Sequence, residues 1–202
     1  MGYSFPMTKE SAILSRWRLN GVALRLRLMR AGDAAAVKLA LERLSPEARR
    51  HRFFSPISEF SDDLVRRLTD VDPIREYAIV VVRDEGTQEI PIAGGRFVHG
   101  EEPGTCEFSL TVGELWQGRG IGRRMLRVLI AEAQRRGLGT MTGHILAENR
   151  PMLGLARRLG FLVQPHPQAP EIRLVSLDLD SVPRRRAPGL LALLFAWATR
   201  SR

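Results

Sequence analysis

The segment WQGRGIG at positions 116–122 carries the clearest signal for ligand chemistry in this sequence. Three glycines alternate within it, and glycine lets backbone N–H groups approach a ligand without a side chain in between. An amphipathic helix is predicted to follow, and the first turn of a helix attracts anions through its free N–H groups and its dipole. Arg119, Arg123 and Arg124 add positive charge. The segment therefore predicts a site for a phosphate-bearing ligand.

Two common phosphate-binding motifs do not fit this segment. A dinucleotide fingerprint, G-x-G-x-x-G, requires a glycine where Arg123 stands, and the P-loop string G-x-x-x-x-G-K-[ST] does not occur in the chain. The pattern that remains is Q-x-x-G-x-G at 117–122, preceded by a predicted strand over 106–112. A second block follows downstream, where Asn149 opens a predicted helix that ends at LGF, 159–161.

Together these blocks resemble the acetyl-CoA signature of the GNAT acetyltransferase superfamily, over roughly residues 22–180. The strings LSPE at 44–47, RFFSP at 52–56 and EF at 107–108 are similar to the acetyltransferase domain of bacterial Pat-type protein lysine acetyltransferases. The resemblance implies a mixed α/β fold, in which helices flank a central, mostly antiparallel twisted sheet. It also implies acetyl-CoA as the co-substrate.

The resemblance further implies which residues contact the coenzyme. The backbone of Leu110, Thr111 and Val112 is expected to hold the pantetheine arm as an added strand would be held, and a backbone N–H there would polarise the thioester oxygen. Asn149 is expected to hydrogen-bond the coenzyme arm, with a plain N-cap as the alternative. The pyrophosphate is expected to lie against Gln117, Gly118, Arg119, Gly120, Ile121, Gly122 and Arg123.

Glu107 is the candidate general base, and the Pat-type resemblance implies a glutamate at this place. Alternation in CEFSLTV puts Glu107 on the opposite strand face from Cys106 and Phe108. Transfer to a lysine requires the neutral amine, and an ordinary pKa of ~10.4 leaves only a few in ten thousand neutral at pH 7. A carboxylate can take the proton directly or through a water. The alternative is a strand glutamate paired with an arginine, and Glu114 is a weaker candidate base.

Other reactive residues have simpler interpretations. Many GNAT members carry a tyrosine that protonates the departing thiolate, but Ala156 stands at that place. A thiol pKa of ~8.5 permits departure without it. Cys106, on the apolar face of its strand, is expected to be a core thiol rather than a nucleophile. The four histidines lack metal-ligand spacing, so we interpret them as surface or structural residues and expect no metal.

The elements that must position these residues run strand, helices, three strands, helix, strand, helix and two strands, which predicts a mixed α/β sheet. Asp33 and Ser61 are expected to cap two helices, and Ser45-Pro46-Glu47 is expected to start another helical turn between them, with proline at a first-turn position. The expected division of the chain is a loosely held arm (1–20), the acetyltransferase domain (21–181) and a basic and apolar tail (182–202).

Composition sets the outer limits. The 202 residues are 44% hydrophobic and 26% charged, values typical of globular proteins, which argues against wholesale disorder, collagen or a coiled-coil rod. The longest apolar run, 190–198, is too short for a bilayer span of about 20 residues, and no signal peptide is visible. A single cysteine fits a reducing compartment, so the cytoplasm is the expected location.

About half of the net charge of +9 comes from the tail, where 183–202 hold five arginines and no acid. The tail is expected to dock on the domain, on a second subunit or at a membrane surface, or to be a disordered end; no specific nucleic-acid binding is expected. The expected function is direct acetyl transfer from acetyl-CoA to an amine, with a protein lysine as the first choice of acceptor. The alternatives are a small-amine acceptor, a non-catalytic acetyl-CoA sensor, and a basic nucleic-acid or membrane binder.

Overall fold

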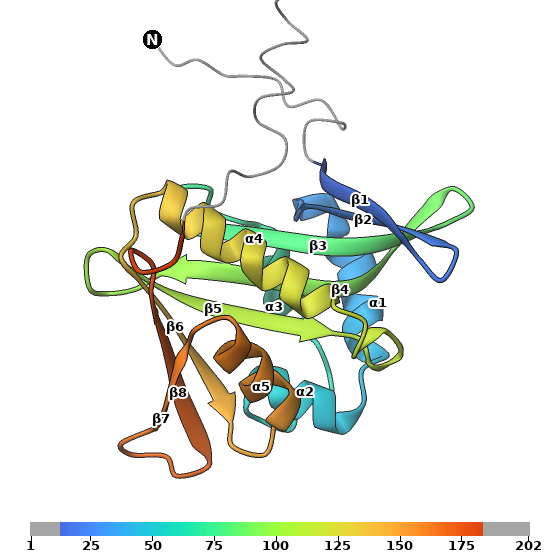
Figure 1. The fold of residues 1–202 in the computed structure, drawn as a ribbon. Helices are drawn as coiled ribbons and strands as arrows, with labels where there is room; N and C mark the ends of the chain where they lie inside the picture. Colours follow the sequence, from blue (N-terminus) through green and yellow to red (C-terminus); the bar gives the residue numbers. More distant parts are fainter. Residues whose placement is uncertain (1–12, 184–202) are drawn as a thin grey trace, which may run out of the picture.

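The computed structural model describes residues 13–183, so the predictions for the tail over 184–202 lie outside the described residues. The described chain forms one eight-stranded sheet, in the order β1-β2-β3-β4-β5-β6-β8-β7, with helices on both faces (Figure 1). Neighbouring strands are antiparallel except β5 and β6, which confirms the expected mixed fold with a mostly antiparallel sheet. The strands are β1 (Ile13–Leu19), β2 (Val22–Leu28), β3 (Glu76–Glu85), β4 (Gln88–His99), β5 (Thr105–Val112), β6 (Thr140–Leu146), β7 (Leu162–Pro165) and β8 (Ile172–Asp178). The α-helices are α1 (Ala34–Glu42), α2 (Pro46–Phe53), α3 (Asp62–Thr69), α4 (Ile121–Arg135) and α5 (Arg150–Arg158).

The first strand corrects the part of the predicted arm over 1–20 that the structure describes, and residues 1–12 lie outside the described residues. Residues Ile13–Leu19 form β1, which pairs with β2 along its length. The guanidinium of Arg124, on α4, lies 4.4 Å from the centre of the Trp17 ring and holds this edge strand against the domain. The alternation RWRL at 16–19 carried the signal, but it spans too few residues to separate a strand from a loop.

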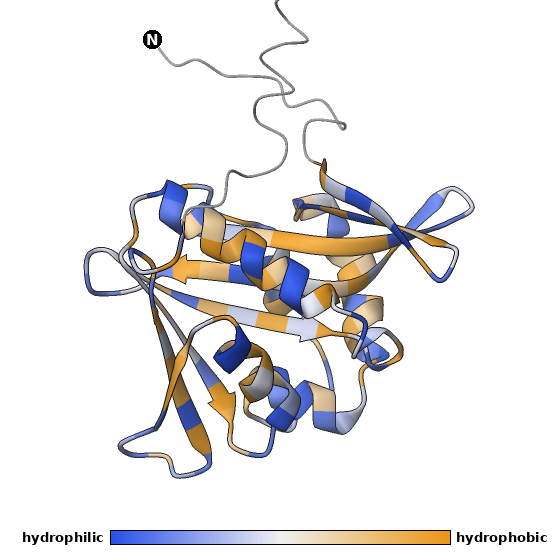
Figure 2. Ribbon diagram, in the orientation of Figure 1, coloured by the Kyte–Doolittle hydropathy of each residue, from blue (hydrophilic) through white to orange (hydrophobic). Residues whose placement is uncertain are grey.

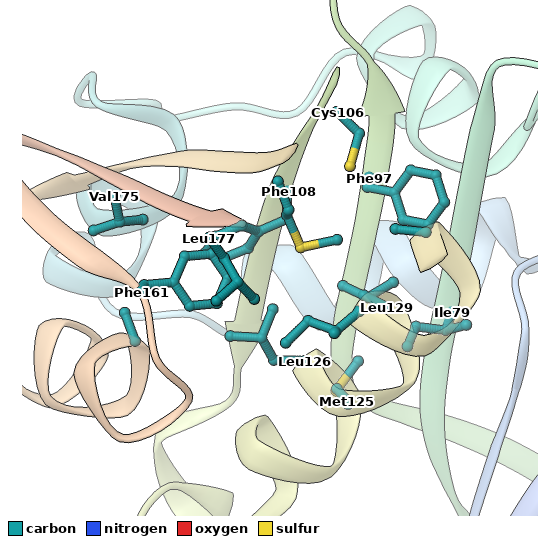
Figure 3. Close-up of a cluster of buried hydrophobic side chains, with 14 of the residues drawn as sticks. Ile79, Phe97, Cys106, Phe108, Met125, Leu126, Leu129, Phe161, Val175 and Leu177 are labelled. Carbon is teal, nitrogen blue, oxygen red and sulfur yellow. The ribbon is translucent and has the colours of Figure 1, made fainter. Parts of the chain in front are cut away.

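The main core lies between the sheet and α4. Met125, Leu126 and Leu129 of α4 pack with Phe97 of β4 and Phe108 of β5 (Figure 3). Most of β3 is hydrophobic, as expected for a strand covered on both faces (Figure 2). Helices α1, α2 and α3 lie on the opposite face from α4. No helix among residues 13–183 combines the length and the apolar character needed to cross a bilayer.

The predicted cap at Ser61 is confirmed, and Ser45, predicted only to start a helix, is also a cap. Ser45 and Ser61 each accept a hydrogen bond from the backbone N–H three residues later, at 3.1 and 3.2 Å, where α2 and α3 begin. Asp33 precedes α1 as expected, but its side chain does not cap the helix. Its carboxylate instead accepts two hydrogen bonds of 2.8 Å from Arg27, a buried residue of β2 that also binds Glu89. The Asp33 carboxylate, which the local sequence predicted as a helix cap, thus binds the buried Arg27 guanidinium instead.

Candidate active site

The candidate site lies where β5 and β6 separate. These strands pair in parallel only between Thr105–Glu107 and Thr140–Thr142. Beyond that point β5 stays paired with β4 and β6 with β8, and the two strands diverge (Figure 1). From Phe108 to Val112, the edge of β5 that faces β6 therefore has no strand partner among the described residues. Such an edge offers N–H and C=O groups to an extended ligand, as predicted for the pantetheine arm.

The glycine turn lies at the C-terminal end of this open edge. Gly118 and Gly120 have φ angles of +70° and +81°, a conformation that favours glycine. Gly120 is the N-cap of α4, and no side chain caps the free N–H groups of the first turn. The backbone at Gly122 packs closely against β5 and α5, because a Cβ there would lie 3.4 Å from the Leu110 side chain and 3.3 Å from the Leu155 side chain. The N-terminus of α4 is therefore next to the open edge of β5.

Several of the predicted coenzyme residues also make contacts within the chain. The side-chain amide of Gln117 donates to the carbonyl of Val112 at 3.0 Å and so occupies the last acceptor of the open edge. The side chain of Ile121 is buried in the core, which leaves only its backbone for a ligand. Arg119 lies 5.8 Å from the Trp116 ring centre and is exposed to solvent.

Among the basic residues and Asn149, some are exposed near the turn and others make contacts within the chain. Arg123 is exposed beside the turn, whereas Arg124, which was expected to add charge there, is directed to β1. Asn149 is the N-cap of α5, and its Oδ1 accepts a hydrogen bond from the Met152 N–H at 3.2 Å. The N-cap interpretation is confirmed, and a contact between Asn149 and the coenzyme stays a prediction.

Glu107 lies at the point where β5 and β6 part. Its carboxylate is half-exposed and lies 2.8 Å from Nδ1 of His144, on β6. The partner is thus a histidine and not the arginine that the alternative interpretation required. From the sequence alone His144 is predicted to be a surface or structural residue, because nothing in the sequence gives the register between two strands whose paired residues lie 37 positions apart. A carboxylate hydrogen-bonded to an imidazole is a suitable proton acceptor.

Glu114, the weaker candidate base, has a structural contact instead. Its carboxylate accepts a hydrogen bond from the Ser45 N–H at 2.8 Å. Partial burial raises the pKa of Glu114, but the hydrogen bonds from Ser45 outweigh that effect, and the pKa lies below its ordinary value. This contact fixes the start of α2 to the end of β5. An ion pair of 3.0 Å between Arg50 and Glu148 fixes the same helix to the loop before α5.

A cavity of about 260 Å³ lies between the sheet and helices α1, α2 and α3, on the face opposite α4. Ser109 and Thr111 of β5 and Arg96 of β4 reach it from the sheet, and Arg52 reaches it from α2. Ser109 lies two residues from Glu107 on the same strand face, which is about 7 Å along the strand. Sequence reasoning missed this cavity, because its walls come from elements far apart in the chain. Its volume is near the lower end of the range for small-molecule sites.

The other candidate reactive residues are placed as follows. Cys106 is 1% exposed, and burial raises the pKa of its thiol to about 12, so the prediction of a core thiol is confirmed. Ala156 is fully buried and leaves no side-chain acid at its position. Within residues 13–183, no three His, Cys, Asp or Glu side chains come together as metal ligands would.

The open strand edge and the adjoining helix N-terminus define the class of protein. The sequence profile of the acetyltransferase (GNAT) family matches residues 38–161. The chain belongs to this family and is an acetyltransferase.

Individual relatives agree with this assignment. The chain is similar to acetyltransferase PA5475 of Pseudomonas aeruginosa, at 32% identity over 73% of this chain and 80% of that protein. It is 32% identical to acetyltransferase Pat of Mycolicibacterium smegmatis, over 54% of this chain and 33% of Pat. The crystal structure of the GNAT domain of S. lividans PAT matches with a TM-score of 0.72, over 81% of this chain and 96% of that chain, at 23% identity. The predicted likeness to Pat-type domains is thus confirmed, and the PAT structure confirms the fold.

Proposed function

We propose that the protein is an acetyl-CoA-dependent N-acetyltransferase that transfers the acetyl group directly to an amine. The observation that carries this proposal is the gap between β5 and β6, which has Glu107 at its closed end and the glycine turn at its open end. An extended acyl carrier with a phosphate group fits that arrangement. Its thioester would then lie along β5 and its pyrophosphate at the N-terminus of α4.

In this proposal the coenzyme is held by the predicted residues, with the corrections that the contacts require. The backbone of Leu110 and the N–H of Val112 supply the strand-like hydrogen bonds, since Gln117 occupies the carbonyl of Val112 and the Thr111 backbone faces β4. The backbone N–H groups of the glycine turn, including that of Ile121, bind the pyrophosphate, and the positive charges of exposed Arg119 and Arg123 attract it. Bound acetyl-CoA supplies an activated acyl group.

Glu107 accepts the proton of the acceptor ammonium, directly or through a water, and the neutral nitrogen then attacks the thioester carbonyl. A C–N bond forms, the C–S bond breaks, coenzyme A leaves as the thiolate, and the second proton of the attacking nitrogen passes to solvent. His144 positions the Glu107 carboxylate by its 2.8 Å hydrogen bond. No side-chain acid is needed for the thiolate, which takes a proton from water, since its pKa is ~8.5.

Two acceptor classes follow from different observations. A protein lysine is the acceptor that the resemblance of LSPE, RFFSP and EF to Pat-type protein lysine acetyltransferases implies. A small amine is the second candidate, and the cavity lined by Ser109, two residues along β5 from Glu107, favours it, because its volume suits a small molecule. A pure acetyl-CoA sensor would have no need of the Glu107–His144 pair.

The test uses purified protein and labelled acetyl-CoA, with a panel of acyl-CoA synthetases, lysine peptides, polyamines, aminoglycosides and amino acids. Coenzyme binding is measured separately by calorimetry. Glu107→Gln should lower kcat/KM roughly 10²–10⁴-fold and leave acetyl-CoA affinity unchanged. Glu101→Gln is the matched control, because Glu101 is an exposed glutamate in the turn before β5.

The outcomes separate the alternatives. Transfer to protein lysines would support the first acceptor class, and transfer to small amines alone would support the second. Coenzyme binding without any transfer, in the wild type as in Glu107→Gln, would favour a sensor. Failure to bind acetyl-CoA would refute the proposal as a whole.

A further inference from the structure

Arg52, in the last turn of α2, faces the cavity without an acidic partner. Its guanidinium is half-buried and forms no ion pair with any carboxylate of residues 13–183. Arg96, across the cavity, is paired with Glu76. Burial and then the positive charge of Arg96 lower the pKa of Arg52 to about 10, while Glu107 acts in the opposite direction. Arg52 is still protonated at neutral pH, so a half-buried cation lies in the cavity wall without a counter-ion.

A buried hydroxyl without a hydrogen-bond partner lines the same cavity. The hydroxyl oxygen of Thr111 is buried and has no hydrogen-bond partner in the described structure. Thr111 lines the cavity together with Ser109, one pleat nearer to Glu107. Buried polar atoms normally have partners, so a hydroxyl without one in a cavity wall is free to hydrogen-bond a ligand that enters the cavity.

The excess of positive charge in the cavity wall favours a negatively charged ligand. Arg43, Arg52, Arg83 and Arg96 line it, and Glu114 is the one acidic residue of the lining. Because the Glu114 carboxylate is occupied by the Ser45 N–H, it does not offset the excess positive charge at Arg52. A polyamine would be repelled by this wall, whereas an anion would be attracted.

We propose that this cavity binds the acceptor through an acid group, so that the acceptor is a small amine that also carries a carboxylate. Arg52 receives the carboxylate, with the Thr111 hydroxyl as a second donor, and the amine of the same molecule points along β5 to Glu107. Arginine suits this task because its planar donors match a carboxylate. The inference rests on the proposed acetyl transfer and adds the substrate class and a specificity-determining residue.

The test compares amines that differ only in the acid. α-Amino acids and short ω-amino acids are assayed as acceptors beside their amides and their decarboxylated counterparts, by thiol release from acetyl-CoA. The variants are Arg52→Gln and Thr111→Val, with Arg16→Gln as the matched control. Arg16 is an exposed arginine of β1 that does not line this cavity. Thr111→Val removes an unsatisfied hydroxyl and so should fold at least as stably as the wild type.

The wild type should prefer the acid over its amide, and Arg52→Gln should lower that preference by ~10–100-fold, mainly through KM. Thr111→Val should lower it less, and Arg16→Gln should leave it unchanged. A purely structural effect of Arg52→Gln would instead lower acid and amide alike, and would overturn the inference.

The remaining outcomes are also decisive. Equal or better use of amides by the wild type would overturn the inference. If no panel member reacts, calorimetry with the same acids in the presence of coenzyme A decides: binding that Arg52→Gln abolishes supports the inference, and no binding overturns it. Intact acetyl-CoA binding in that last case would leave the proposed acetyl transfer standing with another acceptor. Loss of acetyl-CoA binding would remove the proposed function and this inference together.

Discussion

Replacing Gly120 by alanine tests whether the first turn of α4 binds the pyrophosphate of acetyl-CoA. Gly120 has a φ of +81°, and a residue with a side chain in this left-handed conformation costs roughly 1–2 kcal/mol. No atom lies within 4 Å of the added Cβ, so the variant carries strain but no steric clash. The free energy of unfolding should therefore fall by about 1–2 kcal/mol, and the domain should remain folded.

The same helix provides the control at its other end. Gly137, just beyond the C-terminus of α4, has a φ of +74° and equally open surroundings. Gly137→Ala should therefore lose a similar amount of stability in urea denaturation. Because the two variants are matched in strain, a difference in coenzyme affinity must come from the position of the substitution.

Isothermal titration with acetyl-CoA is the assay that separates the two variants. Disturbing one charge-assisted hydrogen bond to the pyrophosphate costs about 1.5–3 kcal/mol. Gly120→Ala should thus raise the Kd roughly 10–150-fold, while Gly137→Ala leaves the Kd unchanged. An unchanged Kd in Gly120→Ala, or the same loss in both variants, would refute the placement of the pyrophosphate at this turn.

Three further predictions concern the fold. Arg27→Met leaves the Asp33 and Glu89 carboxylates without their shared cation, and should lower the free energy of unfolding by about 3 kcal/mol in urea denaturation; a loss below 1 kcal/mol would contradict this. Gly143→Ala places a Cβ 2.6 Å from the Phe108 ring and should cost about 2 kcal/mol, seen as a fall in Tm of roughly 4–8 °C, unless the ring can move aside. Cys106, with its pKa raised to about 12 by burial, should react with a thiol reagent at pH 8 only after denaturant is added, and labelling of the native protein at the rate of a free thiol would show that the site is open.

The sequence by itself determined the features that depend on neighbours in the chain. The glycine turn, the helix start at Ser45, the cap at Ser61 and the strand face of Glu107 were all predicted from residues a few positions apart. Each depends on local backbone geometry, which side-chain alternation, helix capping and glycine express directly. The order of elements likewise predicted the mixed sheet, since three short-turn strands in succession favour an antiparallel meander.

Only the tertiary structure decided which side chains meet across the site. His144 reaches Glu107 from 37 residues away, and Glu114 binds Ser45 across 69 residues. These contacts depend on the register of β5 against β6 and on where α2 packs on the sheet. Neither produces a periodic pattern of residues in the sequence. The same holds for Arg52, which in the sequence is one of 31 basic residues. In the folded chain it lacks a counter-ion in the wall of a cavity, because packing brings α2 over the sheet and leaves no carboxylate of residues 13–183 paired with it.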